Sequence, residues 1–215
     1  MAYDVVIFDL DGTLLDTLDD LMDSCNYALS TIGAPPRTRA EIRRFVGNGI
    51  RNLMLQAVPD GADNPKFEQA YETMQTWYKA HNQIKTAPYP GVQQLIRTLK
   101  QQGVPMAVVS NKPDASVQML VEQWFPEITF GLGEREGLRR KPERDMVDYA
   151  IAQLGQTGKK TVYVGDSEVD LTTAANAGLD CISVTWGFRD RALLVERGAK
   201  QFADTAEELL QLIQG

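Results

Sequence analysis

The chain has 215 residues, of which 43% are hydrophobic and 24% are charged, with 17 glycines and 10 prolines. These values are typical of a globular protein and exclude a disordered, collagen-like or low-complexity chain. The 22 basic and 29 acidic side chains give a formal net charge of −7, which disfavours binding to nucleic acids and to anionic membranes. An anionic ligand would therefore require a bound metal ion or a few locally concentrated cations.

The N-terminal sequence MAYDVVIFDLDG lacks the basic start and the long apolar run of a signal peptide or a membrane span. The two cysteines, Cys25 and Cys181, are far apart in the sequence and do not have the spacing of metal ligands. Free thiols of this kind are typical of a reducing compartment. We therefore expect a cytoplasmic protein.

The first predicted strand is the apolar, β-branched run VVIF at residues 5–8. The next segment, residues 16–85, has helical patterns only. An apolar stripe with helical spacing runs through residues 18–32, Thr38 and Glu41 have the spacing of a capping box, and Asn64 before Pro65 marks another helix start. We predict that residues 16–85 form a small helical domain, here called the cap.

The rest of the chain alternates between further short apolar runs and helical segments, the last helix opening at Thr205. The predicted strands are residues 104–109, 128–130, 161–164 and 181–184. Alternation of this kind is typical of a parallel sheet that is covered by helices on both faces. The predicted fold class is α/β: residues 1–15 and 86–215 form a doubly wound, Rossmann-like parallel sheet, into which the helical cap is inserted.

Polar residues follow three of the predicted strands, and a lysine precedes the helix between the third and fourth. Taken singly, such residues are more often helix caps or turn residues. Together they are informative, because the carboxyl ends of parallel strands meet at one edge of the sheet. Converging carboxylates repel one another unless a cation lies between them, and oxygen ligands favour Mg²⁺. The residues concerned are Asp9, Asp11, Gly12, Thr13, Ser110, Asn111, Lys141, Asp166, Ser167 and Asp170.

Four segments resemble, in order and spacing, the motifs of the haloacid dehalogenase-like hydrolases: FDLDGTLLDT at 8–17, SNK at 110–112, KP at 141–142 and GDSEVD at 165–170. The position of the helical insertion also resembles that of this family's cap. Within the family, RRFVGNGIRNLM at 43–54, SNKP and VTWGFR at 184–189 are most similar to phosphoglycolate phosphatases.

The resemblance implies that Asp9 is the nucleophile that takes the phosphoryl group, and that Asp11 is the general acid and then the general base. It implies that Mg²⁺ is held by Asp9, by the backbone carbonyl of Asp11 and by Asp166, with Ser167 and Asp170 orienting metal-bound water or Lys141. The implied phosphate-binding residues are Gly12, Thr13, Ser110, Asn111 and Lys141.

Two further groups of residues are weaker candidates. In the cap, Gly47, Asn48 and Gly49 interrupt the helical pattern and leave backbone N–H groups available to a substrate, and Arg51, or Arg44, has the reach to bind a substrate carboxylate. Family members often continue the lysine motif as KPxP, whereas this chain has KPERD. Pro142 at a first helical position would fix Lys141, while Arg139 and Arg140 are minor candidates on a charged turn.

The expected function is Mg²⁺-dependent hydrolysis of a small phosphorylated metabolite, with 2-phosphoglycolate as the first candidate, through an aspartyl phosphate. A phosphosugar mutase of the same superfamily is one alternative, and a non-enzymatic receiver-type phospho-acceptor module is another. The cap of about 70 residues and the second aspartate, Asp11, argue against the receiver module. We expect a monomer or a homodimer.

Overall fold

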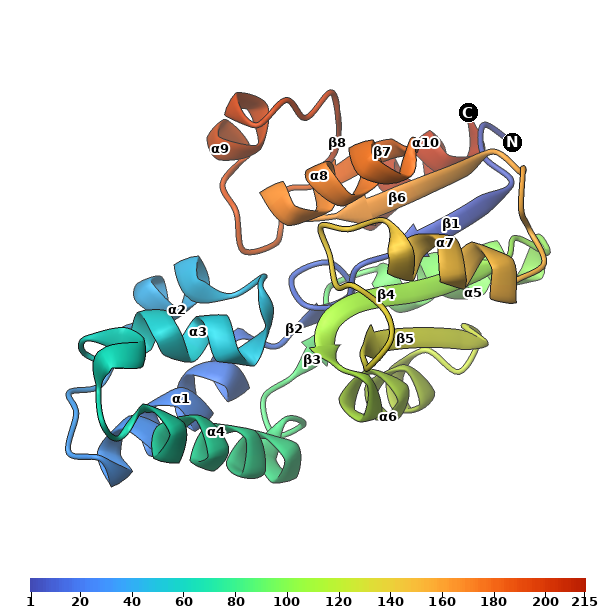
Figure 1. The fold of residues 1–215 in the computed structure, drawn as a ribbon. Helices are drawn as coiled ribbons and strands as arrows, with labels where there is room; N and C mark the ends of the chain where they lie inside the picture. The colour runs from blue at the N-terminus through green and yellow to red at the C-terminus, as the bar shows by residue number, and fades with distance from the viewer. The chain divides into compact units, whose positions relative to one another are not determined.

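The computed structural model describes all 215 residues, and their contacts divide the chain into two compact units (Figure 1). The α/β unit consists of residues 1–15 and 88–215, and the helical unit of residues 16–87. The chain passes between them at β2 (Leu15–Asp16) and β3 (Ala87–Pro88), which pair as a two-stranded sheet. None of the helices has the length and apolar character needed to cross a membrane.

The α/β unit contains a six-stranded sheet in the order β5-β4-β1-β6-β7-β8, and every neighbouring pair is parallel. This confirms the predicted doubly wound α/β fold. The strands are β1 (Val5–Phe8), β4 (Met106–Pro113), β5 (Phe130–Glu134), β6 (Thr161–Gly165), β7 (Asp180–Val184) and β8 (Gln201–Ala203).

Three strands of the six-stranded sheet differ from the sequence prediction by more than one residue, and the short strands β2 and β3 were not predicted. β8 was not predicted, because its sequence, QFA, contains no run of apolar, β-branched residues. β4 was expected to end at residue 109, but its backbone stays extended through the polar residues 110–112, with an irregularity in its pairing to β5 between Val109 and Pro113. The third predicted strand, 128–130, lies too early, because the amide of Ile128 closes a turn onto the carbonyl of Phe125 before β5 begins.

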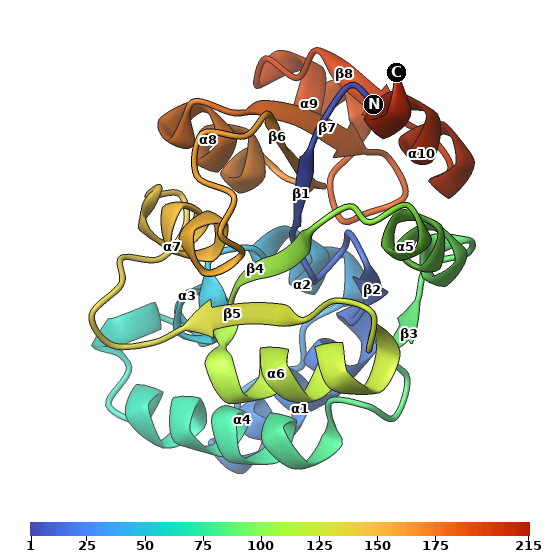
Figure 2. The ribbon, with the colours of Figure 1, turned by 90° about the vertical axis from the view of Figure 1, so that its right-hand side faces the viewer.

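The alternating side chains of the sheet form two apolar layers. Val6 and Phe8 pack on the face covered by α5 (Val92–Gln101), α6 (Asp114–Trp124) and α10 (Ala206–Gln214), while Val5 and Ile7 pack on the face covered by α7 (Asp145–Gln153) and α8 (Glu168–Ala177) (Figure 2). All four residues are fully buried, and β1 is an inner strand of the sheet. Its last residue, Phe8, therefore leads directly into the loop at the carboxyl end of the sheet. The short helix α9 (Arg191–Glu196) follows β7.

The helical unit contains α1 (Leu18–Thr31), α2 (Arg39–Phe45), α3 (Gly49–Ala57), the 3-10 turn Gly61–Asp63 and α4 (Phe67–His81). The predicted capping box is confirmed, with the Thr38 amide donating to Glu41 Oε2 at 2.8 Å and the Glu41 amide donating to Thr38 Oγ1 at 3.3 Å. The buried carboxylate of Asp20 accepts hydrogen bonds from the amides of Lys85 and Thr86. These bonds fix the segment in which the chain returns to the α/β unit.

Candidate active site

The loop after β1 turns tightly at the end of the sheet. The Asp9 amide donates to the carbonyl of Val164 at 2.9 Å, and the Gly12 amide donates to the carbonyl of Leu15 at 2.8 Å. Gly12 has φ of 87°, and a Cβ atom there would lie 2.3 Å from Asp166 Oδ2. Glycine is therefore required at position 12 both by the backbone conformation and by the close approach of the Asp166 carboxylate.

The carboxylates of Asp9, Asp166 and Asp170 form a buried cluster in which one oxygen of each lies within 4.8 Å of the others. Burial and the neighbouring Asp170 raise the pKa of Asp9 to about 7, although Lys141 opposes this shift. Burial, Asp170 and Asp9 likewise raise the pKa of Asp166 well above its usual range. The cluster thus offers only carboxylate oxygens as ligands, and the single charge of Lys141 does not balance its three carboxylates. Such a site is suited to a hard cation.

Lys141 is the cation inside this cluster. Its Nζ lies 2.8 Å from both Asp9 Oδ1 and Asp170 Oδ1, and it donates to the hydroxyl of Tyr163 at 3.0 Å. Burial alone would lower the pKa of Lys141, but the carboxylates of Asp170 and Asp9 raise it well above its usual range. Lys141 is therefore a permanent positive charge beside Asp9. Tyr163 was not anticipated, because its position within an apolar strand indicated a core residue.

The expected placement of Pro142 at the first position of a helix is wrong. α7 begins at Asp145, and the amide of Glu143 instead closes a turn onto the carbonyl of Arg140. Asn111 fixes the backbone within this turn, because its Nδ2 donates to the carbonyl of Lys141 at 3.0 Å. Ion pairs and this hydrogen bond, rather than a helix start, hold Lys141.

Both oxygens of Asp170 are occupied by the chain itself. Oδ1 accepts from Lys141, while Oδ2 accepts from the amides of Asp166 and Ser167 at 3.2 and 3.1 Å and from the Ser167 hydroxyl at 2.6 Å. The carboxylate therefore caps the start of α8 and holds Lys141 at the same time. Gly165 makes this possible, since a Cβ there would lie 2.3 Å from the Asp170 Cβ.

The loop after β7 supports Asp166. The amide of Phe188 donates to Asp166 Oδ2 at 2.6 Å, and a Cβ at Gly187 would lie 2.3 Å from the Asp166 Cβ. The neighbouring Trp186 donates from Nε1 to the carbonyl of Thr13 at 3.0 Å. The segment WGF carries part of the resemblance to phosphoglycolate phosphatases, but that resemblance did not predict these contacts.

Ser110, in the polar part of β4, and Thr13, in the loop after β1, are both buried. The Ser110 hydroxyl accepts a hydrogen bond from the Lys112 amide at 3.2 Å. The Thr13 hydroxyl is buried and has no hydrogen-bond partner in the protein. Because buried polar groups are almost always satisfied, this hydroxyl is suited to a ligand oxygen.

Asp11 contacts a buried lysine, Lys112, which was noted in the SNK segment after the second predicted strand but was given no role. Lys112 Nζ donates to Asp11 Oδ1 at 2.8 Å and to Asp11 Oδ2 at 3.0 Å. The Lys112 side chain is 2% exposed and that of Asp11 is 15% exposed. The two aspartates after β1 therefore have different cationic partners, Lys141 for Asp9 and Lys112 for Asp11.

The weaker candidates have partners of their own. In the helical unit, Arg51 Nη1 donates to Glu68 Oε2 at 3.0 Å, and the guanidinium lies over the ring of Tyr71. Nearby, α3 begins after Asn48, between Gly47 with φ of 126° and Gly49 with φ of 78°. In the α/β unit, Arg139 pairs with Asp145 and Arg140 with Glu134, all at exposed or partly exposed positions.

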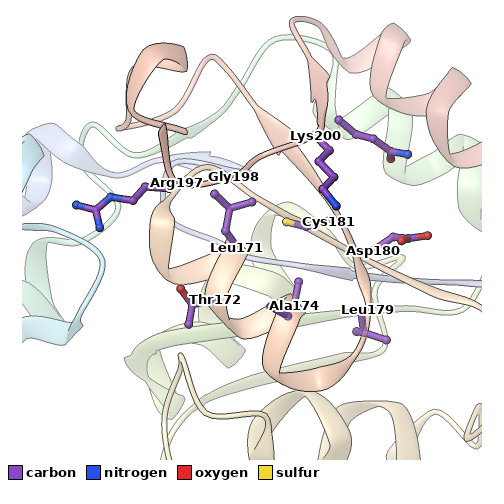
Figure 3. Close-up of a pocket in the computed structure, with 11 residues that line it drawn as sticks. Leu171, Thr172, Ala174, Leu179, Asp180, Cys181, Arg197, Gly198 and Lys200 are labelled. Carbon is purple, nitrogen blue, oxygen red and sulfur yellow. The ribbon is translucent and has the colours of Figure 1, made fainter. Parts of the chain in front are cut away.

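A cavity of about 400 Å³ lies elsewhere in the α/β unit, between α8 and the first residues of β7 and β8 (Figure 3). Leu171, Ala174, Cys181 and Lys200 are among its lining residues (Figure 3). None of the three clustered carboxylates lines it. The cavity lies at the first residues of β7 and β8, whereas the cluster of Asp9, Asp166 and Asp170 follows the last residues of β1 and β6. The candidate active site of this unit is therefore at the carboxyl ends of the strands.

Known proteins are similar over most of the chain. A family model of haloacid dehalogenase-like hydrolases matches residues 6–184. The phosphoglycolate phosphatase of Pseudomonas putida is 33% identical over 194 residues, which are 86% of this chain and 70% of that protein. The phosphoglycolate phosphatase of Agrobacterium fabrum is 32% identical over 198 residues, which are 86% of this chain and 82% of that protein.

Solved structures are similar over both units. A crystal structure from Lactobacillus delbrueckii subsp. bulgaricus, described as a candidate phosphoglycolate phosphatase, has a TM-score of 0.94 at 39% sequence identity and covers 99% of each chain. A predicted phosphoglycolate phosphatase from Haemophilus somnus has a TM-score of 0.90 at 26% identity, covering 99% of this chain and 98% of that one.

Proposed function

The chain belongs to the haloacid dehalogenase-like hydrolases, and on that premise we propose that it is a Mg²⁺-dependent phosphatase that hydrolyses 2-phosphoglycolate through an aspartyl phosphate on Asp9. The observation that carries the proposal is the buried cluster of Asp9, Asp166 and Asp170 around Lys141. The substrate is suggested by relatives named phosphoglycolate phosphatases. The two free cysteines support a reducing, cytoplasmic location.

The donor set fits Mg²⁺, because this cation prefers oxygen ligands and the cluster contains no others. We propose that Asp9, Asp166 and the backbone carbonyl of Asp11 hold it. Asp170 is left out of this set because both of its oxygens already accept hydrogen bonds from the protein. When bound, the metal supplies positive charge to the cluster and to the phosphoryl oxygens.

In the first step, a carboxylate oxygen of Asp9 attacks phosphorus as the bond to the ester oxygen breaks. Asp11 gives its proton to that oxygen, so glycolate departs with a neutral hydroxyl group in place of an alkoxide. Lys141 lies 2.8 Å from Asp9 Oδ1 and is positioned to stabilise the negative charge on the transferring group.

In the second step, water attacks phosphorus and gives a proton to Asp11, and the bond between phosphorus and Asp9 breaks. Inorganic phosphate is released, and both aspartates return to their starting states. We propose that the unsatisfied Thr13 hydroxyl, the Ser110 hydroxyl and the backbone around Gly12 and Asn111 donate hydrogen bonds to the phosphoryl oxygens in both steps.

We further propose that the helical unit acts as the cap of this enzyme and that Gly47, Asn48, Gly49 and Arg51 contribute to substrate selection. Arg51 is already paired with Glu68, so it must exchange this partner in order to bind a substrate carboxylate. Because that exchange breaks the existing ion pair with Glu68, it reduces the binding free energy that Arg51 can contribute to the substrate.

The experiment is a phosphate-release assay over a panel of phosphorylated metabolites, with Mg²⁺ and with a chelator. The expected result is Mg²⁺-dependent release of phosphate, fastest for 2-phosphoglycolate. Undiminished turnover in the chelator would refute the metal assignment. Faster turnover of a phosphosugar, or its conversion to an isomeric phosphate, would refute the substrate assignment.

A further inference from the structure

Lys112 is a buried cation that the mechanism above does not use. Lys112 and Lys141 are the two buried lysines of the chain. Burying an ammonium group is unfavourable unless its charge is compensated. Lys141 is compensated by Asp9 and Asp170, whereas the Lys112 ammonium donates to both oxygens of Asp11.

The contact with Asp11 limits how far the Lys112 ammonium can lie from the ester oxygen of the substrate. As a general acid, Asp11 must come within about 3 Å of the ester oxygen of the substrate. Lys112 Nζ is 2.8 Å from Asp11 Oδ1. The ammonium therefore lies no more than about 6 Å from the ester oxygen when Asp11 is in place to protonate it. Lys141, by contrast, lies beside the proposed nucleophile, Asp9.

We propose that Lys112 is a specificity-determining residue that binds a carboxylate on the leaving group of the substrate. In 2-phosphoglycolate a single methylene separates the ester oxygen from the carboxylate, so a carboxylate that is turned toward Asp11 can reach the Lys112 ammonium. An ammonium has three protons to donate, so by exchanging one of its contacts within the protein Lys112 can hold Asp11 and the substrate together. The inference rests on the proposed function and narrows it to small phosphate esters with a carboxylate next to the ester carbon.

The same contact explains how recognition is linked to proton transfer. A substrate carboxylate at Lys112 places the ester oxygen beside Asp11, because both groups contact the same ammonium. A phosphate ester without a carboxylate gains nothing from Lys112 and is oriented by the phosphoryl-binding residues alone.

The test compares two substrates that differ only in the carboxylate region, 2-phosphoglycolate and ethyl phosphate, and measures kcat/KM for each. The Lys112→Met variant keeps the length of the side chain and removes its charge. A hydrogen bond to a charged group contributes enough to change the ratio of the two kcat/KM values by about 10- to 100-fold. We expect Lys112→Met to lose this preference for 2-phosphoglycolate, and Lys112→Arg to retain more of it than Lys112→Met does.

Lys100→Met is the matched control, because it removes the same charge from an exposed position near the end of α5 and should leave the ratio unchanged. Circular dichroism checks that each variant is folded. If Lys112→Met does not fold, Lys112→Gln replaces it, since its amide still donates to Asp11 but carries no charge.

Equal losses on both substrates in Lys112→Met would overturn the inference, because Lys112 would then act only by holding Asp11. A preference lost in Arg51→Ala but kept in Lys112→Met would also overturn it and assign the carboxylate to the helical unit. Wild-type enzyme that hydrolyses both substrates equally would overturn the inference while leaving a phosphatase. Wild-type enzyme that hydrolyses neither would refute the proposed function itself.

Discussion

Replacing Asp166 with asparagine is expected to stabilise the metal-free protein and to remove most of its response to Mg²⁺. Asn has nearly the shape of Asp and can still accept the hydrogen bond from the Phe188 amide through its Oδ1. Its Nδ2 can donate to the carboxylates of Asp9 or Asp170. The substitution therefore keeps the packing and removes one negative charge from the cluster.

The magnitude follows from the separation of the carboxylates. Two unit charges 4.8 Å apart repel by about 3.5 kcal/mol at an effective dielectric constant of about 20, and the oxygens of the cluster lie within that distance of one another. Asp166 has two such neighbours, but Arg189 and the Phe188 amide offset part of the repulsion, and the raised pKa of Asp166 allows proton uptake to relieve more. We expect a net gain of about 2 kcal/mol at neutral pH.

The assay is thermal unfolding in a chelator and at increasing Mg²⁺. A gain of about 2 kcal/mol corresponds to a rise in Tm of about 4 to 8 °C for a chain of this size. Wild-type protein should gain a comparable amount from Mg²⁺, since a ligand at about 100 times its Kd stabilises by about 2.7 kcal/mol. The Tm of Asp166→Asn should rise much less.

Asp63→Asn is the control, since it removes a charge from an exposed position in the helical unit and should change neither Tm nor its Mg²⁺ dependence. A lower Tm of Asp166→Asn in the chelator would refute the electrostatic reasoning. An unchanged Mg²⁺ response in that variant would refute Asp166 as a ligand.

Three further predictions concern the same site. The pKa of Asp9 is about 7 in the folded protein and about 3.9 in the unfolded chain. Between these two pH values the folded protein therefore holds a proton on Asp9 that the unfolded chain has lost. The stability of metal-free protein should therefore fall as pH rises from about 4 to about 7 and be level above that, and urea unfolding of Asp9→Asn should show a weaker dependence. Asp11→Asn should form an aspartyl phosphate with an activated aryl phosphate and then stall, since acid-base catalysis contributes about 10²- to 10⁴-fold; intact mass that shows no added phosphoryl group on Asp9 would contradict this. Gly187→Ala should lower stability by about 1 to 3 kcal/mol and weaken Mg²⁺ binding, because its Cβ meets Asp166 at 2.3 Å; calorimetric titration with Mg²⁺ equal to that of wild type would exclude this role.

The sequence by itself determined the fold class and predicted the end of the sheet at which the carboxylates of Asp9, Asp166 and Asp170 gather. Residues 5–8 are apolar on both faces, which predicts a central parallel strand, and the structure places β1 there with all four side chains buried. The capping box at Thr38 and Glu41 is equally local, since both partners lie within one helical turn. Such features depend on neighbours in the chain, so they are visible as patterns.

Only the tertiary structure decided which polar groups meet. Lys112 and Asp11 are 101 positions apart in the sequence, and Phe188 and Asp166 are 22 positions apart. Tyr163 reads as a core residue until the fold brings Lys141 to its hydroxyl. These contacts are set by how β4, β6 and the loop after β7 pack beside β1, and packing between distant segments leaves no periodic signal along the chain.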